Sequence, residues 1–198
     1  MAMKKLTQAA GRAREATRKV KTVAKKVAKK AVAKAPTKAR KKVQPIPKGY
    51  HIVTPSLIVR GAAQAIEFYK KAFGAKELYR MEGPDGKMLH SEIKIGDSIV
   101  MIGDEYPDMG ASSPQSIGGS ASSLMIYTRD VDALFNQAVA AGAKVAMPVA
   151  DMFWGDRYGK VTDPFGHQWQ LATHKEDISP KEMKRRAAAA MSAPPQNP

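Results

Sequence analysis

The alternation of apolar and polar positions becomes regular near residue 50, where it predicts a strand, a helix and three further strands. Residues 51–59, HIVTPSLIV, are rich in β-branched side chains, and residues 62–75 place Ile66, Tyr69 and Phe73 at helical spacing before Gly74. KELYRM, KMLHSEIKI and SIVMI are then predicted as strands, joined by a GPDG turn and by the two-residue link Gly96-Asp97. The predicted order of elements is βαβββ.

The same order returns after a loop rich in Gly and Ser near residues 104–121. SSLMIYT is predicted as a strand, DVDALFNQAVAAGA as a helix with Asp130 at its N-cap, and AMPV, RYGKVT and QWQLAT mark three more strands. Because each unit buries one side of its sheet against its own helix, we predict an α+β fold. In this fold two βαβββ modules, residues 50–104 and 122–174, form cupped mixed sheets around a cavity.

The composition narrows the class of protein. The sequence has no cysteine, which excludes disulfides, thiolate metal sites and cysteine nucleophiles. No apolar run approaches the roughly 20 residues that span a bilayer, and no apolar segment follows the first lysines as it would in a signal peptide. We therefore expect a cytoplasmic protein with one folded domain, residues 49–175, and a C-terminal tail, residues 176–198, that holds a short helix.

The net charge of +15 is concentrated in residues 1–48, which hold 17 Lys and Arg against one acid, Glu15. Lys, Ala, Val and Pro dominate this basic arm, so it cannot build a core and we predict that it is disordered. Lysines that neutralise phosphates release counterions, which favours DNA or RNA contact without sequence preference. The predicted nucleic-acid contacts are Lys19, Lys21, Lys25, Lys26, Lys29, Lys30, Lys34, Lys38, Arg40, Lys41 and Lys42.

Two other interpretations of the arm stay open. In the first, the arm is a solvated tail without a dedicated partner. In the second, it is an organellar transit peptide, although the absence of Ser and the excess of Lys over Arg are atypical of such peptides. Residues 49–174 hold 11 basic and 14 acidic side chains, so the folded domain itself has no general attraction for nucleic acid.

AIEFYKKAFGA, GPDGKMLHSEIKIGDSIVMIGDE and WGDRYGKVTDPFGHQWQLATH together resemble the vicinal oxygen chelate (VOC) superfamily, the glyoxalase and bleomycin-resistance fold, and most of all its PhnB-like branch. The resemblance covers about residues 50–175. It implies a fold that hosts lyases, isomerases, dioxygenases and plain binding proteins, and that often forms homodimers. The arm resembles the Lys-, Ala- and Pro-rich tails of linker histones.

The resemblance also implies four positions for the ligands of a metal, and these fall on Thr54, Met101, Ser123 and Gln170. Hydroxyl, thioether and amide groups do not supply the imidazole or carboxylate donors that zinc, nickel or iron require. We therefore expect no metal and no other cofactor.

His90 and Glu92 are the candidate acid–base residues. They alternate in HSE, so they share one face of a strand, and a hairpin turn at Gly96-Asp97 places Glu92 opposite Met101. The resemblance makes Met101 a cavity position, which directs Glu92 there too. The alternative is a structural carboxylate paired with Lys94 or Arg157.

The last predicted hairpin joins the strands RYGKVT and QWQLAT. If Asp163 lies opposite Gly166, then Gly159 pairs with Gln170, and Gln168, Gln170 and Arg157 face the cavity. An arginine there suits a ligand with carboxylate, phosphonate or vicinal oxygen groups, and the alternative is an ion pair with Asp156 or Glu92. His51, His167 and His174 are interpreted as ordinary turn or strand-end histidines.

Three hypotheses follow. The first is a binding protein that holds a small oxygen-rich or hydrophobic ligand without a metal and associates with polyanions through its arm. The second is an enzyme that uses Glu92 and His90, and the third is a nucleoid-associated DNA-binding protein.

Aromatic residues near Trp154 either form a wall of the ligand cavity or pack in the protein interior, and the loop ASSPQSIGGSASS is either a lid or a connector. The predicted cavity residues are Thr54, Ser56, Met101, Ser123, Met125, Trp154, Arg157, Gln168 and Gln170.

Overall fold

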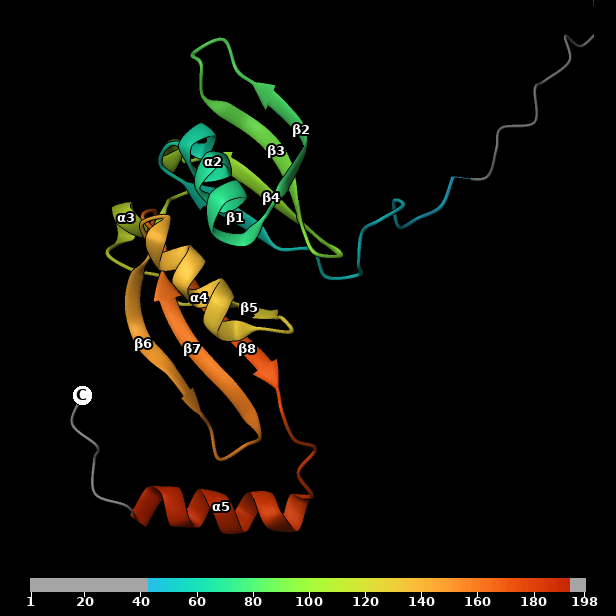
Figure 1. Ribbon diagram of the computed structural model, residues 1–198. Helices are drawn as coiled ribbons and strands as arrows, with labels where there is room; N and C mark the ends of the chain where they lie inside the picture. The colour runs from blue at the N-terminus through green and yellow to red at the C-terminus, as the bar shows by residue number, and fades with distance from the viewer. Residues whose placement is uncertain (1–42, 193–198) are drawn as a thin grey trace, which may run out of the picture. The chain divides into compact units, whose positions relative to one another are not determined.

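The computed structural model describes residues 43–192, and the first module forms a four-stranded sheet covered by one helix (Figure 1). The strands are β1 (Ser56–Val59), β2 (Lys76–Glu82), β3 (Met88–Ile95) and β4 (Ser98–Asp104), and helix α2 spans Ala62–Phe73. Their order is β1-β4-β3-β2, with β1 parallel to β4 and the other pairs antiparallel.

The second module repeats this topology. Its strands are β5 (Ser123–Tyr127), β6 (Lys144–Asp151), β7 (Asp156–Thr162) and β8 (Gln168–His174), in the order β5-β8-β7-β6, and helix α4 spans Val131–Ala140. The Asp130 side chain accepts a hydrogen bond from the Ala133 N–H, as expected of an N-cap. The prediction of an α+β fold built from two βαβββ units is confirmed.

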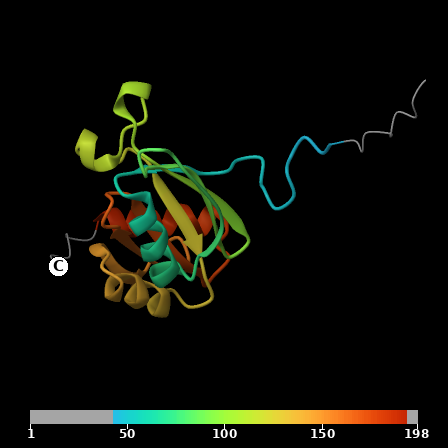
Figure 2. The same cartoon turned by 90° about the horizontal axis from the view of Figure 1, so that it is seen from above.

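The two modules share one hydrophobic core. Helices α2 and α4 lie side by side (Figures 1 and 2), and the Gln137 amide of α4 donates to the Lys71 and Ala72 carbonyls of α2. The rings of Tyr69 and Phe73 lie 5.3 and 4.7 Å from the Trp169 ring of β8. Side chains from both repeats therefore exclude water jointly.

Asp163, in the turn between β7 and β8, is the main polar group of this core. Its buried carboxylate accepts hydrogen bonds from the Tyr69 hydroxyl at 2.7 Å, the Trp169 Nε1–H at 2.9 Å and the backbone N–H groups of Phe165 and His167. Burial beside this carboxylate raises the pKa of Tyr69 well above its ordinary value.

The strand registers agree with prediction in the first module and differ in the second. Glu92 pairs with Met101, as the Gly96-Asp97 turn predicts. The predicted pairing of Gly159 with Gln170 was wrong by one residue, because Gly159 pairs with Leu171. The Asp163 carboxylate accepts from the N–H groups of Phe165 and His167, and the Asp163 N–H donates to the His167 carbonyl. Asp163 therefore lies opposite His167 and not, as predicted, opposite Gly166.

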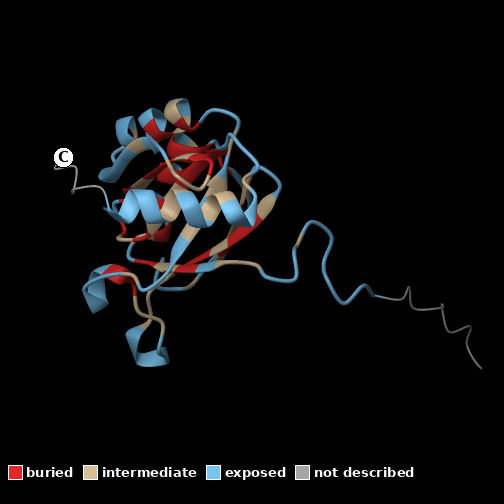
Figure 3. Ribbon diagram, turned by 90° about the horizontal axis from the view of Figure 1, so that it is seen from below, coloured by how far each residue is buried: buried red, intermediate tan, exposed pale blue. Residues whose placement is uncertain are grey.

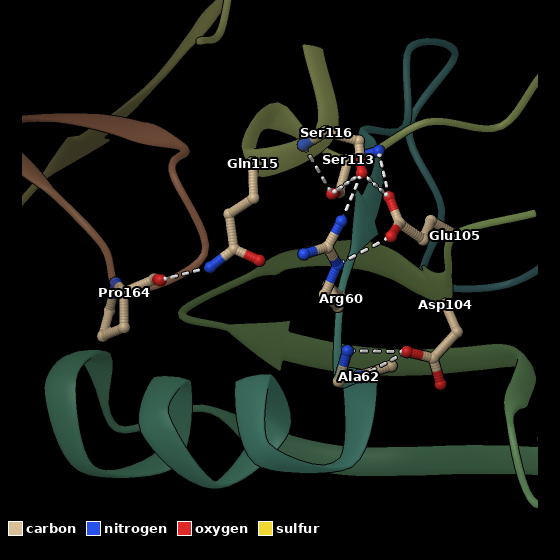
Figure 4. Close-up of polar contacts among 9 residues, drawn as sticks. Arg60, Ala62, Asp104, Glu105, Ser113, Gln115, Ser116 and Pro164 are labelled. Atoms are coloured by element: carbon tan, nitrogen blue, oxygen red, sulfur yellow. Dashed lines mark hydrogen bonds and ion pairs between the residues drawn. The ribbon is translucent and has the colours of Figure 1, made fainter. Parts of the chain in front are cut away.

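The segment that links the modules, residues 105–122, is held in place by polar contacts (Figure 4). It contains the one-turn helices η1 (Pro107–Met109) and α3 (Pro114–Ile117). Arg60 donates to the Glu105 carboxylate at 2.8 Å and to the Ser116 hydroxyl at 2.7 Å, and Gln115 donates to the Pro164 carbonyl. These contacts tie the segment to both modules, which favours the connector interpretation over the lid.

After β8 the chain continues into helix α5 (Pro180–Ser192), the helix expected in the C-terminal tail. Its surface is mostly exposed (Figure 3). Arg186 pairs with Glu176 and Glu182, and the Gly155 carbonyl accepts from the N–H groups of Lys175 and Glu176. Across residues 43–192, no helix is long and apolar enough to span a membrane.

Candidate functional site

The face of the first sheet that points away from α2 carries the predicted acid–base pair. His90 Nε2 and Glu92 Oε1 are 3.0 Å apart on β3, and both side chains are partly exposed. The register places Met101 beside Glu92 and Ser56 beside Met101, so Ser56, Met101 and Glu92 form one row across three strands. The predicted shared face of His90 and Glu92 is confirmed.

Tyr50 joins this pair and was not among the predicted site residues. A hydrogen bond from its hydroxyl to the Glu92 carboxylate, followed by burial and by the charge of Glu92, raises the pKa of Tyr50 to about 12. Hydrogen bonds from Tyr50 and then His90 lower the pKa of Glu92. Tyr50 precedes the first strand, and the hydrophobic pattern alone gives no signal that the chain folds back there over the sheet.

The Tyr50–Glu92–His90 cluster is suited to binding a hydrogen-bond donor. Glu92 is an ionised acceptor at neutral pH, because two neighbouring donors stabilise its charge. A lowered pKa makes a carboxylate a weaker base, so the geometry favours polar recognition over proton abstraction.

The corresponding face of the second sheet carries most of the other predicted cavity residues. Ser123 pairs with Gln168 and Met125 with Gln170 in adjacent strands, and the Gln170 amide donates to the Ser123 hydroxyl at 2.5 Å. Trp154 packs edge-on against Phe153 and against Tyr158 of β7. Trp154 therefore borders this face from the loop between β6 and β7.

Arg157 lies on the opposite face from the one predicted. It pairs with Thr173, on the side of β7 that faces α4, and its guanidinium forms two hydrogen bonds with Asp132 of α4 at 2.6 and 2.7 Å. A third contact reaches Asp151. The shifted register explains the error, because a slip of one residue turns a side chain to the other face of a sheet.

The four positions implied for a metal do not form a donor set. Thr54 precedes β1 and donates to the His51 carbonyl, so it is not in the row of Ser56 and Met101. Within residues 43–192, no group of three or more His, Asp or Glu side chains is arranged to hold a metal ion. The residues present do not fit the metal chemistry of the fold.

A groove of about 940 Å³ lies between β1 and β5, the edge strands of the two sheets. Apolar side chains from both modules line most of it, and the polar residues of its lining include His51, Asp97, Ser98 and Ser122. Of the predicted cavity residues, Ser123 and Met125 line this groove, whereas Thr54, Ser56, Met101, Trp154, Arg157, Gln168 and Gln170 do not. The apolar lining residues are Val53, Pro55, Leu57, Phe73, Ile95, Ile99, Val100, Leu124, Met125, Ile126, Leu134 and Trp169.

Two further histidines have defined partners. His167 is buried and its Nε2 lies 3.0 Å from the Ile58 carbonyl, which links the β7–β8 turn to β1 and fits a structural role. His174 lies between Asp156 and Asp177. The predicted nucleic-acid contacts, Lys19 to Lys42, lie outside the described residues.

Comparison with known proteins identifies the family. Residues 50–171 match the Glyoxalase/Bleomycin resistance protein/Dioxygenase superfamily. An uncharacterized protein of Mycobacterium tuberculosis is 44% identical over 144 residues, which cover 71% of this chain and 82% of that protein. The chain therefore belongs to the glyoxalase and bleomycin-resistance (VOC) superfamily, as the resemblance of its motifs implied.

Solved structures of relatives share the fold. The X-ray structure of an Arabidopsis thaliana gene product matches with a TM-score of 0.52 and 31% identity, covering 62% of this chain and 98% of that one. A PhnB protein from Bacillus cereus matches with a TM-score of 0.50 and 20% identity, covering 62% and 99%. PhnB-like proteins are thus among its structural neighbours.

Proposed function

We propose that this protein binds a small, largely hydrophobic molecule that carries a few oxygen atoms, without the help of a metal. The observation that carries the proposal is the groove between β1 and β5, whose 940 Å³ falls within the range of about 300–1,000 Å³ typical of ligand pockets. Its lining is mainly apolar and includes a few polar side chains. Such a site binds the body of a ligand by burial and orients it by a few hydrogen bonds.

A pair of methionines permits a matched test of the groove. Met125 lines it and is 41% exposed, whereas Met147 is 38% exposed on β6 and does not line it. We expect Met125→Trp to weaken binding of the fluorescent probe ANS by about tenfold, since overfilling a packed apolar space costs about 1–3 kcal/mol. Met147→Trp leaves the affinity unchanged. Equal affinities for both variants and the parent protein would contradict the assignment.

A second candidate function is proton transfer by Glu92 and His90, whose carboxylate and imidazole lie 3.0 Å apart on the open face of the first sheet. The corresponding reactions are those of a lyase, isomerase or dioxygenase. Exchange of carbon-bound protons in small α-hydroxy ketones, followed by NMR in deuterated water, tests it. Glu92→Gln should slow exchange by about a hundredfold if Glu92 is the base. Exchange that is absent, or equal in the variant, removes this candidate.

We also propose that a second copy of the chain covers the open face of the first sheet. This face exposes two large apolar side chains that a lone chain leaves in water, namely Tyr79 and Met81. Light scattering should give a dimer, and Met81→Lys should shift the protein toward monomer. A monomer at micromolar concentration contradicts the proposal.

The basic arm is proposed to associate with DNA or RNA, on the strength of its charge alone. A gel-shift titration with the full chain should show affinity that falls steeply with salt. Replacing the eleven predicted contacts, Lys19 to Lys42, with Gln should abolish that affinity. Retention of binding by the Gln variant at low salt excludes these eleven residues as the contact.

A further inference from the structure

A polar cluster lies at the end of β8, on the face of the second sheet that points away from α4. Asp156 of β7 pairs with His174 of β8, and Ala172 pairs with Tyr158 on one side and Tyr127 on the other. Alternation along the strands places these five residues on one face. None of them was a candidate on the sequence, where His174 is an ordinary strand-end histidine.

Asp156 organises the cluster. Its carboxylate is only 5% exposed, and it accepts hydrogen bonds from the Tyr127 hydroxyl at 3.2 Å and from His174 Nδ1 at 2.8 Å. Because an ionised carboxylate can only accept, His174 Nδ1 carries a proton and the ring is fixed with Nε2 directed away from Asp156. A buried carboxylate that orients an exposed imidazole leaves one ring nitrogen available for a ligand.

That nitrogen is occupied by the chain itself. His174 Nε2 lies 3.1 Å from Oδ1 of Asp177, whose side chain is otherwise fully exposed. Asp156 and Asp177 together raise the pKa of His174. The imidazolium thus already binds one exposed carboxylate, in addition to the buried one.

Aromatic side chains adjoin this charged pair. Tyr158 is buried on the same face, with the Trp154 ring 5.6 Å away and edge-on, and Tyr127 is exposed. Ala172, between the two tyrosines, is the smallest side chain in their row. The exposed ring of Tyr127 next to the His174 imidazolium suits a ligand that combines a ring with an acidic group.

We propose that Tyr127, Asp156, Tyr158 and His174 form a binding site for an aromatic carboxylate, whose acid group replaces Asp177 at His174 Nε2. Exchange of one carboxylate for another preserves the local charge, so the ring contacts supply the preference for the ligand. Asp177 is a built-in competitor that keeps the imidazolium paired when the site is empty. This site adjoins the apolar groove, whose lining includes Tyr127, and differs from it by the charged pair of His174 and Asp156.

Titration of the full chain with naphthoate, followed by NMR of the His174 ring, tests the proposal. We expect the His174 resonances to shift, and Asp177→Ala to tighten binding by about threefold, the range lost with an exposed ion pair. The His174→Gln variant should not bind naphthoate, and its melting temperature should equal that of the parent protein. Asp108→Ala, which removes an exposed carboxylate from η1, is the matched control and leaves the affinity unchanged.

Charge and pH supply further readouts. The ionisable groups that contact His174 are Asp156 and Asp177, with Tyr127 bonded to Asp156, so naphthoate binding should fall as pH rises through the raised pKa of His174. Naphthylmethylamine, the cationic analogue, should not bind. Naphthoate that leaves the His174 resonances unmoved, or binds equally to the parent and Asp177→Ala, overturns the proposal.

Discussion

At the scale of single residues, the Tyr50–Glu92 contact links the chain before the first strand to the open face of the first sheet. Gly49, the residue before Tyr50, lies near Ile99 of that sheet. The phenol donates to an ionised carboxylate, which favours the neutral form of Tyr50 and the charged form of Glu92. The two pKa shifts therefore have opposite signs and a common cause.

We predict that Tyr50 titrates near pH 12 and that Glu92→Gln returns its pKa toward the ordinary value of 10.0. A raised pKa means that the contact stabilises the fold below about pH 10 and that this stability is lost as pH rises toward 12. NMR titration of the tyrosine ring carbons measures the pKa of Tyr50, and the Tyr50→Phe variant assigns its signal. An ordinary Tyr50 pKa in the parent protein would show that the contact does not form.

The orientation of single side chains was predictable where a turn fixes the register. The two-residue link Gly96-Asp97 placed Glu92 opposite Met101, and the structure agrees. Arg157 was misplaced because the Asp163 side chain reshapes the turn after β7, and strand alternation carries no information about such a contact. Tyr50 and Asp177 were not predicted as site residues for a related reason. Both lie outside the strands, where the alternation of side chains does not indicate which residues they contact.

At the scale of elements, α5 depends on the backbone around Gly155. This glycine has φ +95° and its position leaves no room for a side chain, because a Cβ atom would lie 2.4 Å from the Glu176 carbonyl oxygen. The Gly155 carbonyl in turn accepts from Lys175 and Glu176. The connection from β8 to α5 therefore requires glycine at this turn.

We predict that Gly155→Ala loosens residues 175–192 from the domain. Gly118→Ala is the matched control, since Gly118 has φ +84° with open space around its Cβ position. Both variants carry the left-handed backbone cost of about 1–2 kcal/mol, but only Gly155→Ala adds a clash with the backbone. Amide hydrogen exchange of α5 should rise in Gly155→Ala alone. Equal exchange in the two variants would place the anchor of α5 elsewhere.

At the scale of the whole molecule, Asp163 makes the two modules one folding unit. Its carboxylate bonds Tyr69 from the first module and Trp169 from the second. The repeat, the element order and the fold class were predictable from periodicity. The joining of the repeats was not, because Tyr69 lies 94 residues before Asp163 and the hydrophobic pattern around each residue indicates only its own local element.

We predict that Asp163→Asn lowers the free energy of unfolding by about 3 kcal/mol, since an amide cannot accept from all four donors and leaves buried N–H or O–H groups unpaired. Asp85→Asn, in the exposed GPDG turn of the first module, should cost little. Urea unfolding measures both, and a single transition is expected for the parent. A small effect of Asp163→Asn would mean that the turn does not connect the modules.

The shared core also sets how related proteins can recombine. A chimera that takes residues up to the linking segment from one family member and the remainder from another joins a Tyr69 position to a foreign Asp163 and Trp169. Such a hybrid keeps the contacts of this buried carboxylate only if both parents carry the same three partners. Exchange of one half between family members is therefore expected to lower stability wherever one of the three differs.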